Sequence, residues 1–286
     1  MRASQSGFTL VELVITMVLS VIVVAFMAQF ISGPVEGYVD QTRRAELVDL
    51  ADNSLRRMAR DVHSALPNSL RVLTNGPVVA LELLSAVDGG RYRDTPPPID
   101  ADNFLDLTGA DTQFNVVGGF SNLTKPFASS NHYLAIYNVG VPGANAYEMT
   151  NVITPPGTTI SITASGVAGE DRVQMSPAFH FAFGSPGKRV FLVEGPVTWL
   201  CDSATGTLSR YSGYAVAANQ TSRDTGPELA AAGAFSSLVA ENVDACAFNY
   251  TPGTAERAGL LSATLAIADS GESVTLLHQV HTDNVP

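Results

Sequence analysis

Positive charge is scarce in this chain. Its 286 residues include 16 lysines and arginines against 27 aspartates and glutamates, a formal net charge of −11 at pH 7. The basic residues are scattered, and the small pairs Arg43-Arg44 and Arg56-Arg57 have acidic neighbours. Because nucleic-acid binding needs a concentrated basic surface, we do not expect a nucleic-acid partner. We interpret the arginine pairs as part of a solvated helix face.

The sequence also lacks the short motifs of common catalytic sites. It contains no nucleophile elbow, no P-loop and no His-Glu-x-x-His zinc motif. A P-loop-like run ends at Lys188, but Ala182 stands where its first glycine is required. His278 and His281 lie three positions apart on a predicted strand, so they point to opposite faces and do not readily share a metal. We therefore expect a protein that is not an enzyme and has no cofactor.

A group of oxygen-bearing side chains in the middle of the chain is a weak calcium candidate. Asp100, Asp102, Asn103 and Asp106 place hard ligands close to one another, which suits Ca²⁺. The glycine and the terminal glutamate of an EF-hand loop are missing. A solvated acidic loop is the alternative, and we favour it over a metal site.

Charge is almost absent from one long segment near the N-terminus. Between Phe8 and Ile31 the only charged residue is Glu12. A helix of this length would measure roughly 36 Å, enough to cross a hydrocarbon core of about 30 Å. The segment is too long for a secretory signal and has no suitable small-residue cleavage site. With Arg2 on its N-terminal side, the positive-inside tendency predicts a cytoplasmic leader, a single span and an exported remainder.

The lone carboxylate in this segment calls for an explanation. A charge near the centre of a membrane helix costs about 2.5–3.5 kcal/mol on insertion scales and marks function by default. The run from Gly7 through Phe8 to Glu12 resembles the prepilin motif of type IV pilins and type II secretion pseudopilins. That resemblance implies that a prepilin peptidase cuts after Gly7 and N-methylates Phe8, which leaves Glu12 as the fifth residue of the mature chain.

A role for Glu12 follows from its pairing requirements. The α-amine of Phe8 carries a proton near neutral pH, and in an apolar helix bundle an unpaired ammonium and an unpaired carboxylate are both costly. Our hypothesis is that Glu12 accepts the Phe8 amine of a neighbouring subunit and so fixes the register of assembly. The alternative is a polar residue tolerated in a plain membrane anchor.

The export prediction bears on the two cysteines, Cys201 and Cys246. In an exported protein an even number of cysteines indicates a disulfide. A bridge across this separation would stabilise the fold by roughly 4 kcal/mol in the chain-entropy model. A metal site is the alternative, but no neighbouring Cys-x-x-Cys or His-x-x-His motif supplies the two further ligands it needs.

Beyond the apolar segment, Gly33-Pro34 is predicted to kink or break the helix. From Tyr38 to Leu66, apolar residues recur every three or four positions, which predicts an amphipathic helix that Pro67 ends. The expected organisation is a leader at 1–7, a transmembrane or filament-core helix at 8–31, an amphipathic helix at 32–66 and a β-rich periplasmic head at 67–286.

The remainder of the chain reads as β-structure, because β-branched and aromatic runs alternate with Gly, Pro, Asn and Asp clusters. The predicted strands are Leu70–Leu73, Val78–Leu84, Phe114–Val117, Tyr133–Val139, Thr159–Thr163, Phe179–Phe183, Val190–Val193, Val197–Cys201, Thr207–Tyr214, Ala245–Tyr250, Leu260–Ile267 and Ser273–Val280. Tight turns are predicted at 88–90, 204–206 and 269–271. The sequence therefore predicts an α+β fold, a long N-terminal helix packed on an antiparallel sheet.

The length of the head resembles that of large minor pseudopilins of the J/W class, which cap or prime filaments. The stretches 197–202, 206–211, 246–250, 257–260 and 277–286 resemble minor pilins of the mannose-sensitive haemagglutinin (MSHA) pilus. The resemblance implies other minor pilins, the major pilin, prepilin peptidase and an inner-membrane assembly platform as partners. It also implies residence in the bacterial inner membrane and then in the pilus. The alternative is a membrane-anchored adhesin or binding domain that uses the helix as an anchor.

Overall fold

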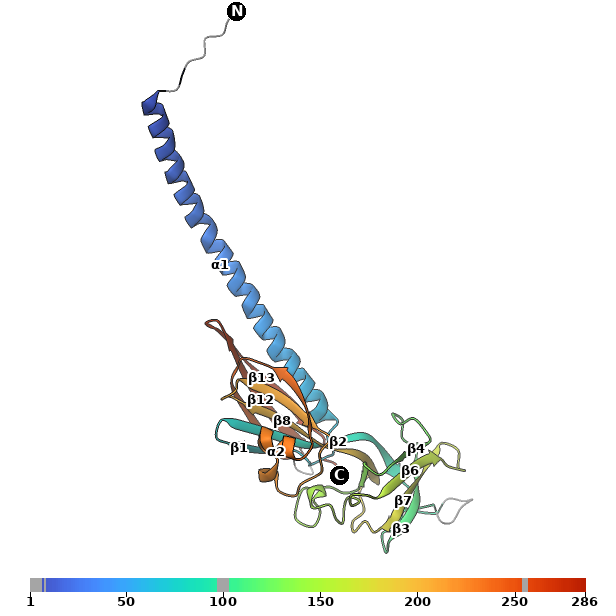
Figure 1. Cartoon of the computed structure of the whole chain (residues 1–286). Helices are drawn as coiled ribbons and strands as arrows, with labels where there is room; N and C mark the ends of the chain where they lie inside the picture. Colours follow the sequence, from blue (N-terminus) through green and yellow to red (C-terminus); the bar gives the residue numbers. More distant parts are fainter. Residues whose placement is uncertain (1–6, 8, 97–102, 254–256) are drawn as a thin grey trace, which may run out of the picture.

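The computed structural model describes residue 7 and residues 9–96, 103–253 and 257–286; at position 28 and positions 31–36 it describes the backbone alone. In these ranges a long N-terminal helix leads into a β-rich head (Figure 1). Antiparallel pairing joins all the strands whose register is defined. The predicted α+β fold is therefore confirmed.

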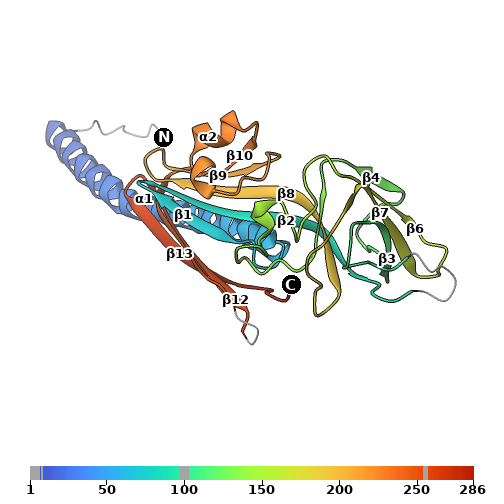
Figure 2. The same ribbon diagram turned by 90° about the horizontal axis from the view of Figure 1, so that it is seen from below.

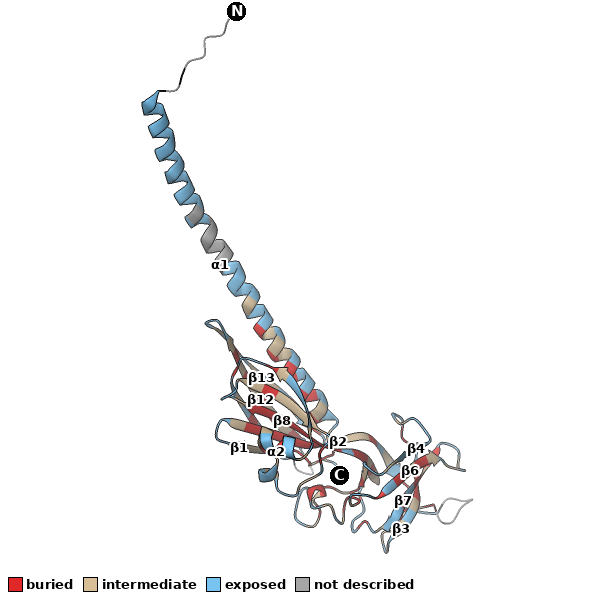
Figure 3. Ribbon diagram, in the orientation of Figure 1, coloured by how far each residue is buried: buried red, intermediate tan, exposed pale blue. Residues whose placement is uncertain are grey.

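Helix α1 (Leu10–His63) is a single helix of 54 residues. The described side chains of its first half are exposed, and its last turns bury residues at spacings of three and four, which gathers apolar side chains on one face. The buried apolar positions are Leu47, Ala51, Leu55, Met58, Ala59 and Val62. Figure 3 shows that burial in α1 is confined to the part that lies beside the head.

Of the kink or break predicted at Gly33-Pro34, the break is wrong, because α1 continues through both positions. Proline removes one backbone donor and has a φ that a helix accepts, and the long helical stretches on either side maintain the remaining hydrogen bonds. The helix ends at His63, three residues earlier than predicted. The chain then turns, and the Leu66 N–H donates to the Leu84 carbonyl at 2.8 Å.

Ten strands of the described chain form one sheet, in the order β10-β9-β8-β2-β3-β7-β6-β4, with β1 paired to β2 and β5 paired to β8. Their bounds are β1 (Arg71–Asn75), β2 (Val78–Tyr92), β3 (Asp111–Val117), β4 (Phe127–Ser129), β5 (Tyr133–Ala135), β6 (Thr159–Ala164), β7 (Glu170–Phe179), β8 (Arg189–Asp202), β9 (Thr207–Ser212) and β10 (Phe235–Ala240). Short helices η1 (Ala146–Glu148), η2 (Gln220–Ser222) and α2 (Gly226–Ala231) lie in the connections.

A second sheet contains β11 (Val243–Thr251), β12 (Gly259–Asp269) and β13 (Glu272–Thr282). The β12–β13 hairpin pairs Ala268 with Ser273 and Asp269 with Glu272, so the turn predicted at 269–271 is confirmed. Viewed from below, the end of α1 runs between β12–β13 on one side and the long strands β2 and β8 on the other (Figure 2). The helix therefore packs against both sheets.

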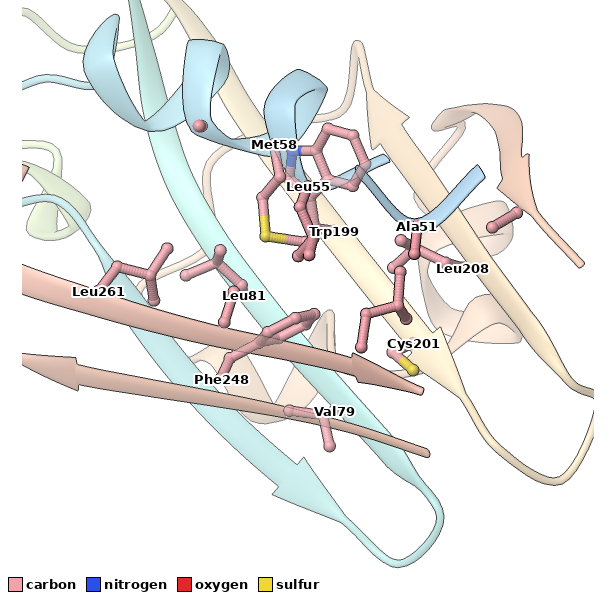
Figure 4. Close-up of a cluster of buried hydrophobic side chains, with 14 of the residues drawn as sticks. Ala51, Leu55, Met58, Val79, Leu81, Trp199, Cys201, Leu208, Phe248 and Leu261 are labelled. Atoms are coloured by element: carbon pink, nitrogen blue, oxygen red, sulfur yellow. The ribbon is translucent and has the colours of Figure 1, made fainter. Parts of the chain in front are cut away.

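The main core lies between the helix and the two sheets. Trp199 from β8, Leu81 from β2 and Phe248 from β11 meet Leu55 and Met58 of α1 (Figure 4). Burial of a large apolar side chain contributes about 1.5–3 kcal/mol, so this cluster fixes the last turns of α1 to the head. A second core lies farther from the helix, among β3, β6, β7 and the distal ends of β2 and β8.

Several predicted strand limits are wrong. The segments 190–193 and 197–201 are parts of one strand, β8, and the turn predicted at 88–90 lies inside β2. A Cβ at Gly90 would clash with the Val116 side chain, and one at Gly89 would lie 3.1 Å from the Phe191 ring. These glycines let neighbouring side chains approach the strand rather than forming a turn.

Candidate functional site: the N-terminal helix and its attachment to the head

The start of α1 contains the described part of the predicted processing and assembly site. Gly7 is exposed just before the helix, and Thr9 is its N-cap. The Thr9 hydroxyl accepts the Glu12 N–H at 3.3 Å and donates to Glu12 Oε2 at 3.4 Å. Phe8, the expected first residue of the mature chain, lies outside the described residues.

Glu12 is therefore in the first turn of the helix rather than near its middle. Its position three residues after a threonine N-cap is that of the glutamate in a capping box, and an acidic side chain there also complements the helix dipole. The structure gives Glu12 a local partner that the sequence argument missed. The Thr-x-x-Glu spacing at the start of an apolar run was the signal for it.

The helix that follows presents a largely apolar surface. The segment Leu10–Met27 has a mean hydropathy of 2.7, and none of it is buried in the protein. Large side chains such as Leu10, Phe26 and Phe30 are among the most exposed apolar groups of the described chain. By length and composition this is the one helix of the described residues that can cross a membrane. Exposure on all sides suits burial in lipid or among other helices.

The other end of α1 is fastened to the head by a polar contact at the edge of the main core. Asp61 Oδ2 accepts the indole Nε1–H of Trp199 at 2.9 Å and the Nε–H of Arg210 at 2.6 Å. Trp199 on β8 and Arg210 on β9 are cross-strand partners, so both point toward the helix. A force on the apolar half of α1 is thus transmitted to the sheet through a charge-assisted contact as well as through packing.

Cys201 and Cys246 form a disulfide, with their Cα atoms 6.5 Å apart. Cys201 lies on β8 of the large sheet and is fully buried, and Cys246 lies on β11 of the small sheet. Both sulfurs are used in this bond, which removes them as metal ligands. The bridge covalently joins the two sheets that enclose the end of α1.

The calcium candidate falls largely outside the described residues, which exclude Asp100 and Asp102. The Asp106 carboxylate accepts the Thr108 N–H at 2.8 Å and the Thr108 hydroxyl at 2.7 Å, and these bonds lower its pKa. Asn103 is buried. Across the described part of the chain, no group of three or more His, Cys, Asp or Glu side chains is arranged to hold a metal ion.

A polar cluster inside the head was also missed from sequence. Glu82, fully buried on β2, pairs with Arg71 at 2.7 Å and accepts the Tyr214 hydroxyl at 3.1 Å. Burial raises the pKa of Glu82, and Arg71 opposes that shift. Arg71 also donates to the carbonyls of Ala217 and Ala218. The cluster therefore ties a long surface connection to the sheet, which is a structural role.

Comparison with known proteins gives one result for the N-terminal segment. Residues 2–28 match the family model described as the prokaryotic N-terminal methylation motif. No curated protein and no solved structure matches the chain. The matched residues include the Gly7–Glu12 motif and most of the apolar segment of α1. The chain thus carries the N-terminal methylation motif, which type IV pilins and pseudopilins share.

Proposed function

We propose that this chain is a minor pilin or pseudopilin that acts in assembly of a type IV filament, in its initiating or tip complex. The observation that carries the proposal is the apolar half of α1, exposed on every side and carrying Glu12 in its first turn. A globular head is fixed to the other half of the same helix. One element thus serves first as a membrane span and then as a packing surface for other subunits.

The proposed sequence of events starts in the bacterial inner membrane, with the head in the periplasm. Prepilin peptidase removes residues 1–7 and methylates Phe8. The subunit then leaves the membrane by way of the assembly platform and docks on other minor pilins or the major pilin. Glu12 accepts the Phe8 amine of a neighbouring subunit. In this ion pair the buried carboxylate and the buried ammonium satisfy each other, whereas each would be costly to bury alone.

The leader has to be removed before that contact forms. While residues 1–7 are attached, Phe8 has an amide nitrogen instead of a charged amine, and Arg2 brings a positive charge to the same place. Processing would therefore create the partner of Glu12 at the moment when assembly is permitted.

We further propose that the filament is of the MSHA type and that the subunit corresponds to MshO. Support comes from the five stretches that resemble MSHA minor pilins. The structure places two of these stretches on the adjoining strands β8 and β9, and two more on β11 and β13. They therefore lie in the part of the head that encloses α1, and not in the distal part with the second core.

Intact mass and N-terminal peptide mass spectrometry test the first step. The protein is isolated from membranes of cells with and without prepilin peptidase. We expect a peptidase-dependent mature chain that starts at N-methyl-Phe8. A chain that still starts at Met1, or one that is cut near Ala28, contradicts the proposal.

The rival function is a membrane-anchored adhesin or binding domain, and Glu12→Ala separates it from assembly. In an assembly subunit this change should remove the protein from sheared filaments and from complexes with other pilins, while membrane insertion persists. In an anchored binding domain, the change should leave filament number and composition unchanged.

A further inference from the structure

The head contains a cleft that the assembly proposal does not use. It has a volume of about 830 Å³ and lies where the middle of β8, the end of β9 and the start of β10 meet the loops before β5 and β6. Glycines line part of it, which leaves backbone accessible, and its side chains include His132, Tyr133, Glu194, Arg210 and Phe235. Polar and aromatic groups therefore face the same open space.

The backbone of β8 is shaped to present Glu194 to this cleft. Ser85 of β2 pairs with Gly195, and the next residue, Ala86, pairs with Val193. Glu194 is thus the extra residue of a β-bulge, a feature that redirects a side chain and is frequent beside functional sites. The adjoining Gly195 has φ 146°, which L side chains rarely adopt. A regular strand would not place the carboxylate in this way.

The charge of the cleft is negative and unbalanced. Arg210 is already paired with Asp61. Partial burial lowers the pKa of His132 more than the negative charge of Glu194 raises it, which favours the neutral ring at pH 7. Among the described residues, Glu194 has no hydrogen bond or ion pair with another side chain. A carboxylate that lines the same cleft as the aromatic residues Tyr133 and Phe235 is a combination that suits an ammonium or guanidinium group, through charge and cation–π attraction.

The edge strand next to the cleft indicates that the ammonium or guanidinium group bound there belongs to the side chain of another protein. β10 is the last strand of the large sheet, and its first four residues, 235–238, are all exposed. Phe235 is 75 % exposed and Leu238 is 52 % exposed. Natural edge strands are usually protected by charge or proline, and residues 235–240 contain neither. This edge can accept an added strand through its free backbone groups.

Phe235 belongs to both the edge strand and the cleft, since it is the first residue of β10 and lines the cleft. Its ring lies against Gly213, where a Cβ would clash with it. We propose that an extended segment of a neighbouring filament subunit adds to the edge of β10, passes over Phe235 and places an arginine or lysine on Glu194. This inference rests on the proposed function, because it takes the partner to be another filament subunit.

Site-specific photo-crosslinking in cells tests the inference with the full chain. A photoreactive residue replaces Ser237 on β10, and a matched probe replaces the exposed Ala128 on β4, the edge at the other end of the same sheet. We expect an adduct with another filament subunit from position 237 and not from position 128. The linked peptide, identified by mass spectrometry, should contain a lysine or an arginine.

The variant Glu194→Gln then tests whether the partner's basic side chain binds the Glu194 carboxylate. This isosteric change should reduce the adduct at position 237 about tenfold. Glu194→Lys should also reduce it, and combining Glu194→Lys with an acidic replacement of the partner's basic residue should restore the adduct. Unchanged melting temperature and disulfide formation show that the variant is folded. An adduct that is insensitive to Glu194→Gln overturns the inference, and so does a carbohydrate adduct.

The amount of this chain in filaments and membrane assembly complexes is measured in the same cells. If the chain is present there and position 237 gives no adduct, the inference is wrong and the proposed function stands. If the chain is absent from both, the proposed function and the inference fail together.

Discussion

The indole Nε1–H of Trp199 donates to Oδ2 of Asp61 at 2.9 Å and so joins the largest fully buried side chain among the described residues to the helix. The same oxygen receives Nε of Arg210 at 2.6 Å. One carboxylate thus satisfies a buried donor and a partly buried cation, and the last turns of α1 cannot rotate without losing both contacts.

Removal of that carboxylate should loosen the helix from the head. Asp61→Ala leaves the Trp199 and Arg210 donors without an acceptor, which costs about 1–3 kcal/mol. We expect a corresponding loss in the free energy of unfolding, measured by urea denaturation of the detergent-solubilised protein. Asp52→Ala is the matched control, because Asp52 pairs with Arg56 on the exposed face of the same helix, and it should change stability by about 0.5 kcal/mol or less. Equal effects of the two variants would contradict this role.

The disulfide should matter most for the attachment of the small sheet. Cys201 and Cys246 are separated by 45 positions, and in the chain-entropy model a link of this length contributes about 4 kcal/mol. Cys246→Ala is the preferred variant because Cys246 is only half-buried, whereas a change at Cys201 also disturbs the core. We expect lower stability of this variant under oxidising conditions and no difference from the wild type after reduction. A persistent difference after reduction would assign the effect to packing.

Glu82 makes the stability of the head depend on pH in an unusual direction. Burial raises the pKa of Glu82 above its ordinary value of 4.5. The folded state then holds the proton more tightly than the unfolded state. The contribution of Glu82 to the free energy of unfolding is therefore complete below pH 4.5 and is lost as pH rises through the folded-state pKa. Glu82→Gln imitates the protonated form. We expect the stability of this variant, relative to wild type, to increase with pH by at most about 1.4 kcal/mol per unit.

Glu170 provides the opposite case in the same head. Arg93 donates its Nε–H to Glu170 Oε1 at 2.8 Å, and this hydrogen bond lowers the pKa of Glu170. The contribution of Glu170 to the free energy of unfolding is therefore present above its pKa in the unfolded state, and it is lost as pH falls through its pKa in the folded state. Glu170→Gln should destabilise the protein more at pH 7 than at pH 4. Unfolding curves of both variants across this range would show slopes of opposite sign, and parallel slopes would contradict the assignment.

The features predicted correctly from sequence are those encoded by contiguous residues. The 7–12 motif, the apolar stretch behind it and the hairpin around residues 269–271 each depend on local spacing. β7 was missed because it begins with Glu170 and Asp171, which look solvent-exposed in sequence. Both are buried and paired, Glu170 with Arg93 and Asp171 with Lys125 at 2.6 Å. Partners this far apart along the chain leave no local pattern.

The cleft beside β10 could not be predicted for the same physical reason. The direction of Glu194 depends on a bulge in its register with β2, and the exposure of Phe235 depends on β10 being the last strand of the sheet. Both are properties of strand order. Sequence periodicity identifies strands and the face that each one buries, but it does not give the order in which distant strands pair.

Glu12 has two possible roles, and a pair of variants separates them. As part of a capping box it needs only a hydrogen-bonding side chain, a role that glutamine also performs. As the acceptor of a neighbour's Phe8 amine it needs its charge. Glu12→Gln should therefore retain the start of α1 but lose filament incorporation at least tenfold, as Glu12→Ala does. Thr9→Ala removes the cap and keeps the charge, so it should leave incorporation largely intact. If Glu12→Gln is incorporated normally while Thr9→Ala is not, helix capping at Thr9 explains the carboxylate and the register hypothesis is wrong.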